Sequence, residues 1–253
     1  MKPLTYTLAN PAGNITVLVE TPVPVCAQPK AAAFLMKKES LAEQVGFVTN
    51  TALRMAGGEF CGNATASAAA LYCRKNNLQT ADLSVTVCGL DYPVSVALQG
   101  EHYNTCVTLP PPQKITAERL CVNGTAVLLP CVWMDGIAHL IVETDMEKAL
   151  AEQAVQQWAA QLRVDALGLM FLSAENRLDP LVFVPGANTL HWENSCASGT
   201  AAVTAYLHAT KKTDKVVLRQ PGGVLQAETA EEDAILLAGT VMLSEPRTAL
   251  WEG

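Results

Sequence analysis

The chain has 253 residues, half of them hydrophobic and 16% charged, and its formal net charge is −7. This length is enough for one large domain or two small ones with real hydrophobic cores. The acidic balance argues against nucleic acid and membrane surfaces as partners, because both select basic proteins. No apolar run approaches the roughly 20 residues that cross a bilayer, and residues 1–14 lack the apolar core of a signal peptide. We therefore expect a cytoplasmic protein.

Runs of β-branched and apolar residues predict many short strands, and apolar positions at helical spacing predict four helices. The strands are expected at 15–19, 83–88, 94–98, 126–133, 139–143, 168–172, 181–184, 216–219 and 234–242. The helices are expected near 27–42, 64–76, 146–162 and 199–211. Each half of the chain then has many short strands and about two helices. This pattern is typical of an α+β fold rather than of wound βαβ units.

The chain also resembles itself once. Gly13–Glu20, a turn followed by a strand, recurs as Gly136–Glu143, and Cys61–Ala66 recurs as Cys196–Ala201. Four such blocks follow one another in the same order at nearly constant displacement, which indicates two homologous halves. The alternative is that chains of alternating strands and helices look self-similar by chance. Homologous halves would place Cys61 and Cys196 at equivalent positions.

A run of three prolines, at 110–112, follows a strand-like segment and can continue neither a strand ladder nor a regular helix. We place the junction between the halves there. The N-terminal half then covers residues 1–112 and carries Cys61, and the C-terminal residues 243–253 could join it. The C-terminal half covers residues 113–242 and carries Cys196.

Eight cysteines occur, and in a reducing compartment they are expected to be thiols rather than disulfides. No two have the CxxC spacing of a zinc site or a redox pair, and the four histidines show no ligand spacing. We therefore expect no metal and no cofactor. Most of these thiols are expected to be small buried hydrophobes, so a functional cysteine must be recognised by its surroundings.

Cys61 and Cys196 stand out because each precedes a segment of small helix-forming residues. A helix start offers unpaired N–H groups and the positive end of the helix dipole, which lower the pKa of a thiol and attract a carboxylate. Gly62, Ala197 and Ser198 are small enough for a substrate to approach the backbone closely. For one such cysteine alone inert packing is the better interpretation, but two at equivalent positions favour function.

Two thiols of one type suit a racemase, which removes a proton from one face of Cα and delivers one to the other. One cysteine acts as the thiolate base and the other as the thiol acid, with the roles exchanged in the reverse direction. This predicts a racemase of a free amino acid that works without a cofactor. A hydrolase with a single catalytic cysteine fits less well, because no histidine lies in an obvious partner motif.

The motifs Cys61-Gly62-Asn63 and Cys196-Ala197-Ser198-Gly199 resemble those of the diaminopimelate epimerase superfamily over nearly the whole chain. The resemblance implies catalysis without pyridoxal phosphate. It also implies two pseudo-symmetric halves, each a mostly antiparallel sheet wrapped around a central helix. An arginine expected shortly before the second cysteine is missing, so diaminopimelate is a doubtful substrate.

The strings Glu43-Gln44-Val45-Gly46-Phe47 and Trp192-Glu193-Asn194-Ser195-Cys196 are more similar to histidine racemases of staphylopine-type metallophore pathways. That resemblance implies histidine as the substrate. It implies that Asn14, Gln44 and Asn63 contact the amino-acid head, and that Glu43 or Glu193 contacts an ammonium or imidazole N–H. Asn194, in the second string, is a further substrate-binding candidate.

Several interpretations stay open. Glu43 could instead cap or solvate a turn, Trp192 could line a side-chain pocket or pack in the core, and His139 is expected to be a satisfied structural group. The substrate could be diaminopimelate or a broader set of amino acids. The chain could also be a silent amino-acid-binding protein on the same scaffold, although both thiols are present. A homodimer is a further expectation.

Overall fold

The computed structural model describes residues 2–252, which form four α-helices and seventeen strands. The chain divides into two compact units. Unit 1 contains the residues up to Thr108 and those from Ala238 onward, and unit 2 contains Leu109–Leu237. Within residues 2–252, no helix combines the length and the apolar character that a membrane crossing requires. The two sheets and four helices confirm the α+β class.

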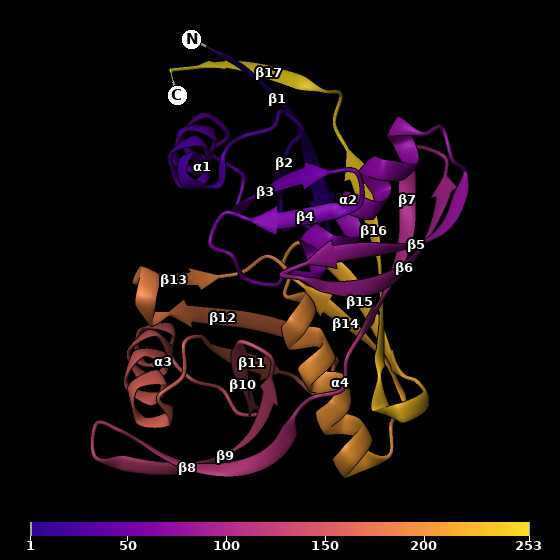
Figure 1. The fold of residues 1–253 in the computed structure, drawn as a ribbon. Helices are drawn as coiled ribbons and strands as arrows, with labels where there is room; N and C mark the ends of the chain where they lie inside the picture. Colours follow the sequence, from indigo (N-terminus) through magenta and orange to yellow (C-terminus); the bar gives the residue numbers. More distant parts are fainter. Residues whose placement is uncertain (1, 253) are drawn as a thin grey trace. The chain divides into compact units, whose positions relative to one another are not determined.

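Unit 1 is built on a ring of eight strands, each hydrogen-bonded to the next, which β16 closes by pairing with both β7 and β1 (Figure 1). The ring order is β1 (Lys2–Pro11), β2 (Thr16–Val19), β3 (Gln44–Thr49), β4 (Ala52–Met55), β5 (Thr80–Val87), β6 (Leu90–Gln99), β7 (His102–Leu109) and β16 (Ile235–Leu243). A further strand, β17 (Arg247–Trp251), pairs with β1 outside the ring. Closure leaves these eight strands without an open edge, which makes the ring a barrel.

Two helices pack against the strands of unit 1. Helix α2 (Gly62–Lys75) contacts five strands of the barrel, and 11 of its 14 residues are buried. Its alanines, serine and threonine leave the room that a helix needs when strands surround it. Helix α1 (Gln28–Lys38) follows the short 3-10 helix η1 (Val25–Ala27), and its buried Ala31, Ala32 and Leu35 form a core with residues of β1, β2 and β3.

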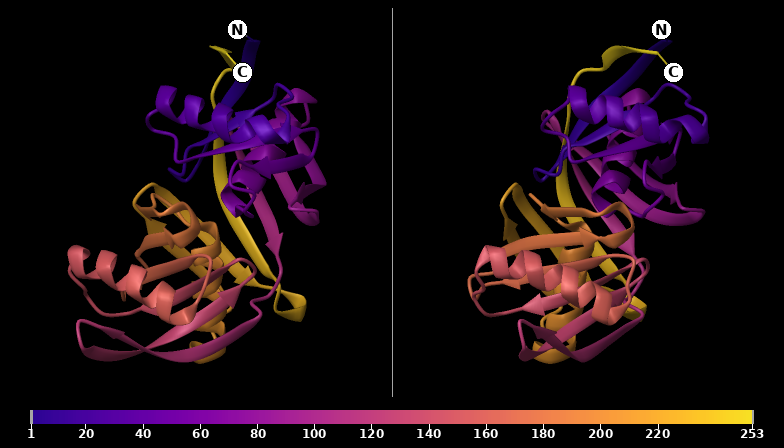
Figure 2. Two further views of the ribbon diagram at one scale, coloured as in Figure 1. Left: turned by 60° about the vertical axis from the view of Figure 1, so that its left-hand side comes forward. Right: turned by 90° about the vertical axis from the view of Figure 1, so that its left-hand side faces the viewer.

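Unit 2 contains a six-stranded sheet with a helix on each face (Figure 2). The sheet order is β13 (Thr189–Trp192), β12 (Leu178–Val184), β11 (Leu167–Leu172), β10 (Ile137–Val142), β9 (Thr125–Met134) and β8 (Lys114–Val122). Helix α3 (Lys148–Leu162) contributes its buried face to the core of this sheet. Helix α4 (Ala197–Lys211) contacts β9, β10 and β11 and the hairpin of β14 (Lys215–Gln220) and β15 (Gly223–Thr229). Two 3-10 helices, η2 (Pro185–Ala187) and η3 (Glu231–Asp233), complete the unit.

The same succession of elements occurs in both units. In unit 1, β2 and β3 are parallel neighbours with Thr16 opposite Gln44, and α1 lies between them in the chain. In unit 2, β10 and β11 are parallel neighbours with Ala138 opposite Leu167, and α3 lies between them. A buried helix that begins directly after a cysteine follows in each unit. The order of elements therefore gives the two cysteines the same local setting.

All four expected helices are present, with shifted ends. Helices α2 and α4 begin at Gly62 and Ala197, two residues before the predicted starts, and α1 ends at Lys38 rather than at residue 42. The β14–β15 hairpin turns at Pro221 and Gly222. The prediction missed several strands, including β3, β4, β8 and β13. β4 and β13 have only four residues each, which is too short for a clear periodic signal.

Trp158 of α3 is the largest fully buried side chain, and its Nε1–H donates to the Cys121 carbonyl at 3.0 Å. We expect Trp158→Ala to lower the free energy of unfolding by about 3–5 kcal/mol, because it leaves a large cavity in the core of unit 2. Urea unfolding followed by circular dichroism measures this. Leu128→Ala, at a side chain 68% exposed, is the matched control and should change stability little. A loss below about 1 kcal/mol for Trp158→Ala would contradict the close packing of this side chain.

Candidate active site

Cys61 is the N-cap residue of α2. Its backbone is extended, with φ −141° and ψ 112°, and its sulfur accepts a hydrogen bond from the Ala64 N–H at 3.4 Å. Cysteine here takes the place of the serine or aspartate that usually caps a helix. Gly62 and Asn63 form the buried first turn behind it, and the Asn63 side chain is 3% exposed. The sequence prediction of a thiol at the start of this helix is confirmed.

Cys196 occupies the corresponding position in unit 2. It is the N-cap residue of α4, its backbone is extended, and its sulfur accepts from the Gly199 N–H at 3.3 Å. Ala197 is buried in the first turn, and the Ser198 hydroxyl lies 3.6 Å from the Cys196 sulfur. Both predicted thiols thus interact with a backbone N–H three residues further along the chain.

The surroundings of Cys196 raise its pKa well above the usual value, chiefly through burial. The Glu193 carboxylate raises the pKa further, by its charge and by a hydrogen bond with the thiol, whereas Ser198 and the Gly199 N–H lower it. The expectation that the helix start would depress the pKa of this thiol is therefore wrong. Burial and the nearby negative charge destabilise the thiolate more than its hydrogen-bond donors stabilise it, so the pKa rises.

Sequence reasoning offered Glu193 as a contact for a substrate N–H, but the structure places it beside the Cys196 thiol. A carboxylate that accepts the hydrogen bond of a thiol can also accept its proton. The Glu193 carboxylate lies within hydrogen-bonding distance of the Cys196 thiol.

Gln220 is a functional neighbour that the sequence did not reveal. Its Oε1 accepts from the Cys196 N–H at 2.8 Å, and its Nε2 donates to the Thr200 hydroxyl at 2.9 Å. Gln220 ends β14, directly before the turn at Pro221. A polar residue beside a Pro-Gly turn was the only signal available. Gln220 fixes the backbone of the cysteine from 24 residues away.

The predicted residues Asn14, Glu43 and Gln44 come together in unit 1. Gln44 Nε2 donates to Asn14 Oδ1 at 2.6 Å, and Asn14 Nδ2 donates to Glu43 Oε2 at 2.6 Å. Gln44 Nε2 also donates to the Thr16 hydroxyl at 2.8 Å. Asn14 precedes β2 and Glu43 precedes β3, so the parallel pairing of these strands brings their leading residues side by side. Asn14 accepts through Oδ1 and donates through Nδ2, and Gln44 donates twice through Nε2, so these bonds determine the orientations of both amides.

A cavity of about 490 Å³ in unit 2 includes Trp192, Glu193 and Asn194 in its lining. Trp192 is half-buried there, stacks on Phe171 and donates its Nε1–H to Glu152 at 2.8 Å. It therefore lines a cavity and also packs against the core of unit 2. Asn194 is exposed at the rim, and its backbone carbonyl accepts from the Gly222 N–H at 2.8 Å.

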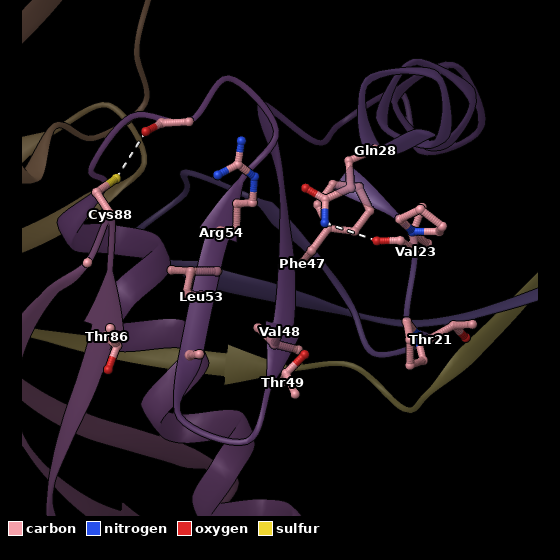
Figure 3. Close-up of a pocket in the computed structure, with 15 residues that line it drawn as sticks. Thr21, Val23, Gln28, Phe47, Val48, Thr49, Leu53, Arg54, Thr86 and Cys88 are labelled. Atoms are coloured by element: carbon pink, nitrogen blue, oxygen red, sulfur yellow. Dashed lines mark hydrogen bonds between the residues drawn. The ribbon is translucent and has the colours of Figure 1, made fainter. Parts of the chain in front are cut away.

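Figure 3 shows a larger cavity, of about 870 Å³, on unit 1. Gln28, Phe47, Arg54 and Cys88 are part of its lining, and the Cys88 thiol donates to the Gly58 carbonyl at 3.0 Å. It lies beside the start of α1 and the strands β3 and β4, and none of the predicted site residues lines it. Size alone therefore does not identify the functional site. No group of three or more His, Cys, Asp or Glu side chains that could hold a metal ion occurs among residues 2–252.

The fold is shared with several solved structures. A hydroxyproline epimerase from Agrobacterium vitis superposes with a TM-score of 0.68 at 8% identity, covering 99% of this chain and 93% of the other. A PhzF-family phenazine biosynthesis protein from Enterococcus faecalis superposes with a TM-score of 0.65 at 16% identity, covering 99% and 100%. At these identities the likeness establishes the fold alone. The chain therefore has the α+β fold of these structures.

Sequence comparison identifies the family to which the chain belongs. A family model described as the histidine racemase CntK N-terminal domain matches residues 3–244. A histidine racemase from Fusobacterium nucleatum is 33% identical over 253 residues, covering 94% of both chains. A histidine racemase from Staphylococcus aureus is 29% identical and covers 85% of this chain and 84% of its own. The chain belongs to the histidine racemase CntK family.

Proposed function

We propose that this protein interconverts L- and D-histidine by two-base proton transfer at Cα, with Cys61 and Cys196 as the acid–base pair. The observation that carries the proposal is the shared geometry of these two thiols. Each caps a buried helix of its own unit, and each sulfur faces a backbone N–H of the first turn. Membership of the histidine racemase family supports histidine as the substrate.

The proton transfers at Cα take place between the two thiols and the substrate. The thiolate of one cysteine removes the α-proton, and the thiol of the other delivers its proton to the opposite face of Cα. Afterwards the first cysteine is the thiol and the second the thiolate, so the enzyme is ready for the reverse reaction. Negative charge that develops at Cα spreads into the substrate carboxylate. The first-turn N–H groups of α2 and α4, which a helix does not use internally, suit such a carboxylate.

Glu193 supplies the proton acceptor that Cys196 needs before it can act as a base. The thiol proton passes to the carboxylate, leaving a thiolate and a carboxylic acid, and returns when Cys196 must act as an acid. This role is supported by the hydrogen bond between the two groups. Glu193 then serves the thiol rather than the imidazole of the substrate.

Glu43 is the better candidate for recognition of a substrate N–H. Its carboxylate already accepts from Asn14, whose amide is oriented by Gln44. A carboxylate has about four acceptor positions, so Glu43 can also accept from an ammonium group or an imidazole N–H. A charge-assisted bond of this kind favours a substrate with such donors.

The division of the chain into two halves is also part of the proposal. We infer that residues 1–112, with 243–253, and residues 113–242 are duplicated halves, which the common order of their elements supports.

The acidic net charge of −7 suits a cytoplasmic enzyme. A homodimer is expected, and light scattering on the purified protein tests it.

Incubation with L-histidine in D₂O tests the proposed function. We expect the α-proton signal of histidine to disappear in the NMR spectrum while D-histidine accumulates to equal amounts, because the two enantiomers have the same free energy. Diaminopimelate and alanine in parallel samples should keep their α-protons. No exchange with any free amino acid would reject the racemase, and exchange with diaminopimelate alone would reassign the substrate.

A further inference from the structure

His139 lies on β10 in unit 2 and is fully buried. Its Nε2 lies 3.1 Å from the Ser198 hydroxyl, which in turn lies 3.6 Å from the Cys196 sulfur. Gly168 stands opposite His139 in the pairing of β10 with β11, and a Cβ atom at that position would overlap Nδ1. The absence of a side chain at residue 168 therefore creates the space that the imidazole occupies.

Burial lowers the pKa of His139 to about 3, so the ring is neutral at physiological pH. Its Nδ1 is buried and has no hydrogen-bond partner among residues 2–252. The expectation that His139 is a fully satisfied structural group is therefore only half right. A buried N–H without an acceptor is rarer in proteins than a buried acceptor without a donor. The proton is therefore on Nε2, and the unpaired atom is the Nδ1 lone pair.

This tautomer determines the direction of the hydrogen bonds. The Nε2–H group of His139 donates to the hydroxyl oxygen of Ser198, so this oxygen is the acceptor in the bond. The hydroxyl hydrogen of Ser198 is then available to the Cys196 sulfur, which already accepts from the Gly199 N–H. Glu193 is the charged group acting on this sulfur, and it opposes the thiolate. Ser198 and the Gly199 N–H stabilise the thiolate.

We propose that His139 is a positioning residue, which holds the Ser198 hydroxyl as a hydrogen-bond donor to the sulfur of Cys196. It does not exchange protons with the substrate. Its role is to orient the Ser198 hydroxyl by a hydrogen bond to the Ser198 oxygen. Cys196 can then form a thiolate in a buried site next to the Glu193 carboxylate. The significance for catalysis rests on the proposed function, but the effect on the thiol can be measured without turnover.

The test follows the alkylation of Cys196 by iodoacetamide as a function of pH, with the Cys196 peptide quantified by mass spectrometry. We expect Ser198→Ala and His139→Phe each to slow alkylation near neutral pH by about tenfold at most, and to move the profile to higher pH, because a donor to the thiolate is lost or misdirected. Ser198→Thr, which keeps the hydroxyl, should restore the wild-type profile. Thr204→Val removes another buried hydroxyl of α4, one that donates to the Thr200 carbonyl, and should leave the profile unchanged.

The double variant His139→Phe/Ser198→Ala separates orientation from simple packing. If His139 acts through Ser198, the double variant should alkylate like Ser198→Ala alone. Additive effects would overturn the proposal, as would an unchanged profile for Ser198→Ala. If His139→Phe does not fold, as judged by circular dichroism, the comparison of alanine with threonine at residue 198 still decides whether the hydroxyl donates to the sulfur. Wild-type protein that shows the predicted thiol behaviour but no exchange of histidine would reject the proposed function and leave this inference standing.

Discussion

Cys61→Ser and Cys196→Ser should each reduce the rate of histidine racemisation by about a thousandfold. This loss lies within the range of rate contributions made by positioned acid–base groups. A serine hydroxyl keeps the size of the thiol and can still cap the helix. It is a far weaker acid than a thiol, so it neither forms the base nor delivers the proton at neutral pH. Circular dichroism recording of racemisation from each enantiomer measures the loss.

The matched control is Cys26→Ser, which changes an exposed thiol in the 3-10 helix before α1. Its racemisation rate should stay within about twofold of the wild type, because surface substitutions rarely disturb the fold. If either Cys61→Ser or Cys196→Ser kept near-normal activity, the two-base assignment would be wrong. Loss in only one of them would indicate a one-base reaction.

Glu193→Gln should speed the alkylation of Cys196 and slow racemisation. The carboxylate raises the pKa of the Cys196 thiol, so its replacement by an amide should lower that pKa and speed alkylation at neutral pH. The amide cannot accept the thiol proton, so racemisation should fall by about a hundredfold. A variant that only loosened the fold would not combine a more reactive thiol with a slower enzyme.

Glu175→Gln provides the control, because Glu175 lies exposed between β11 and β12 in the same unit. Both its alkylation profile and its racemisation rate should match the wild type. Slower alkylation of Cys196 in Glu193→Gln would contradict the role assigned to this carboxylate. Unchanged racemisation in Glu193→Gln would show that Cys196 loses its proton to another acceptor.

Much of the local structure was predictable from the sequence because its causes are local. The run of small residues after Cys61 predicted a helix, and α2 is that helix, with 11 of its 14 residues buried. The start of α4 after Cys196 was predictable for the same reason. Several strands were missed because they are stable only when paired with neighbours distant in the chain. For example, β4 has four residues and pairs with both β3 and β5.

The sequence alone determined the two thiols at helix starts, because capping and helix formation depend on residues within one turn. Only the tertiary structure decided what surrounds Cys196. Gln220 holds its backbone from another strand, and His139 faces its neighbour Ser198 from β10. Burial beside Glu193 even reversed the expected direction of the thiol pKa shift. Burial is the main cause of this shift, and it depends on every element that packs around the thiol, which no short segment of sequence contains.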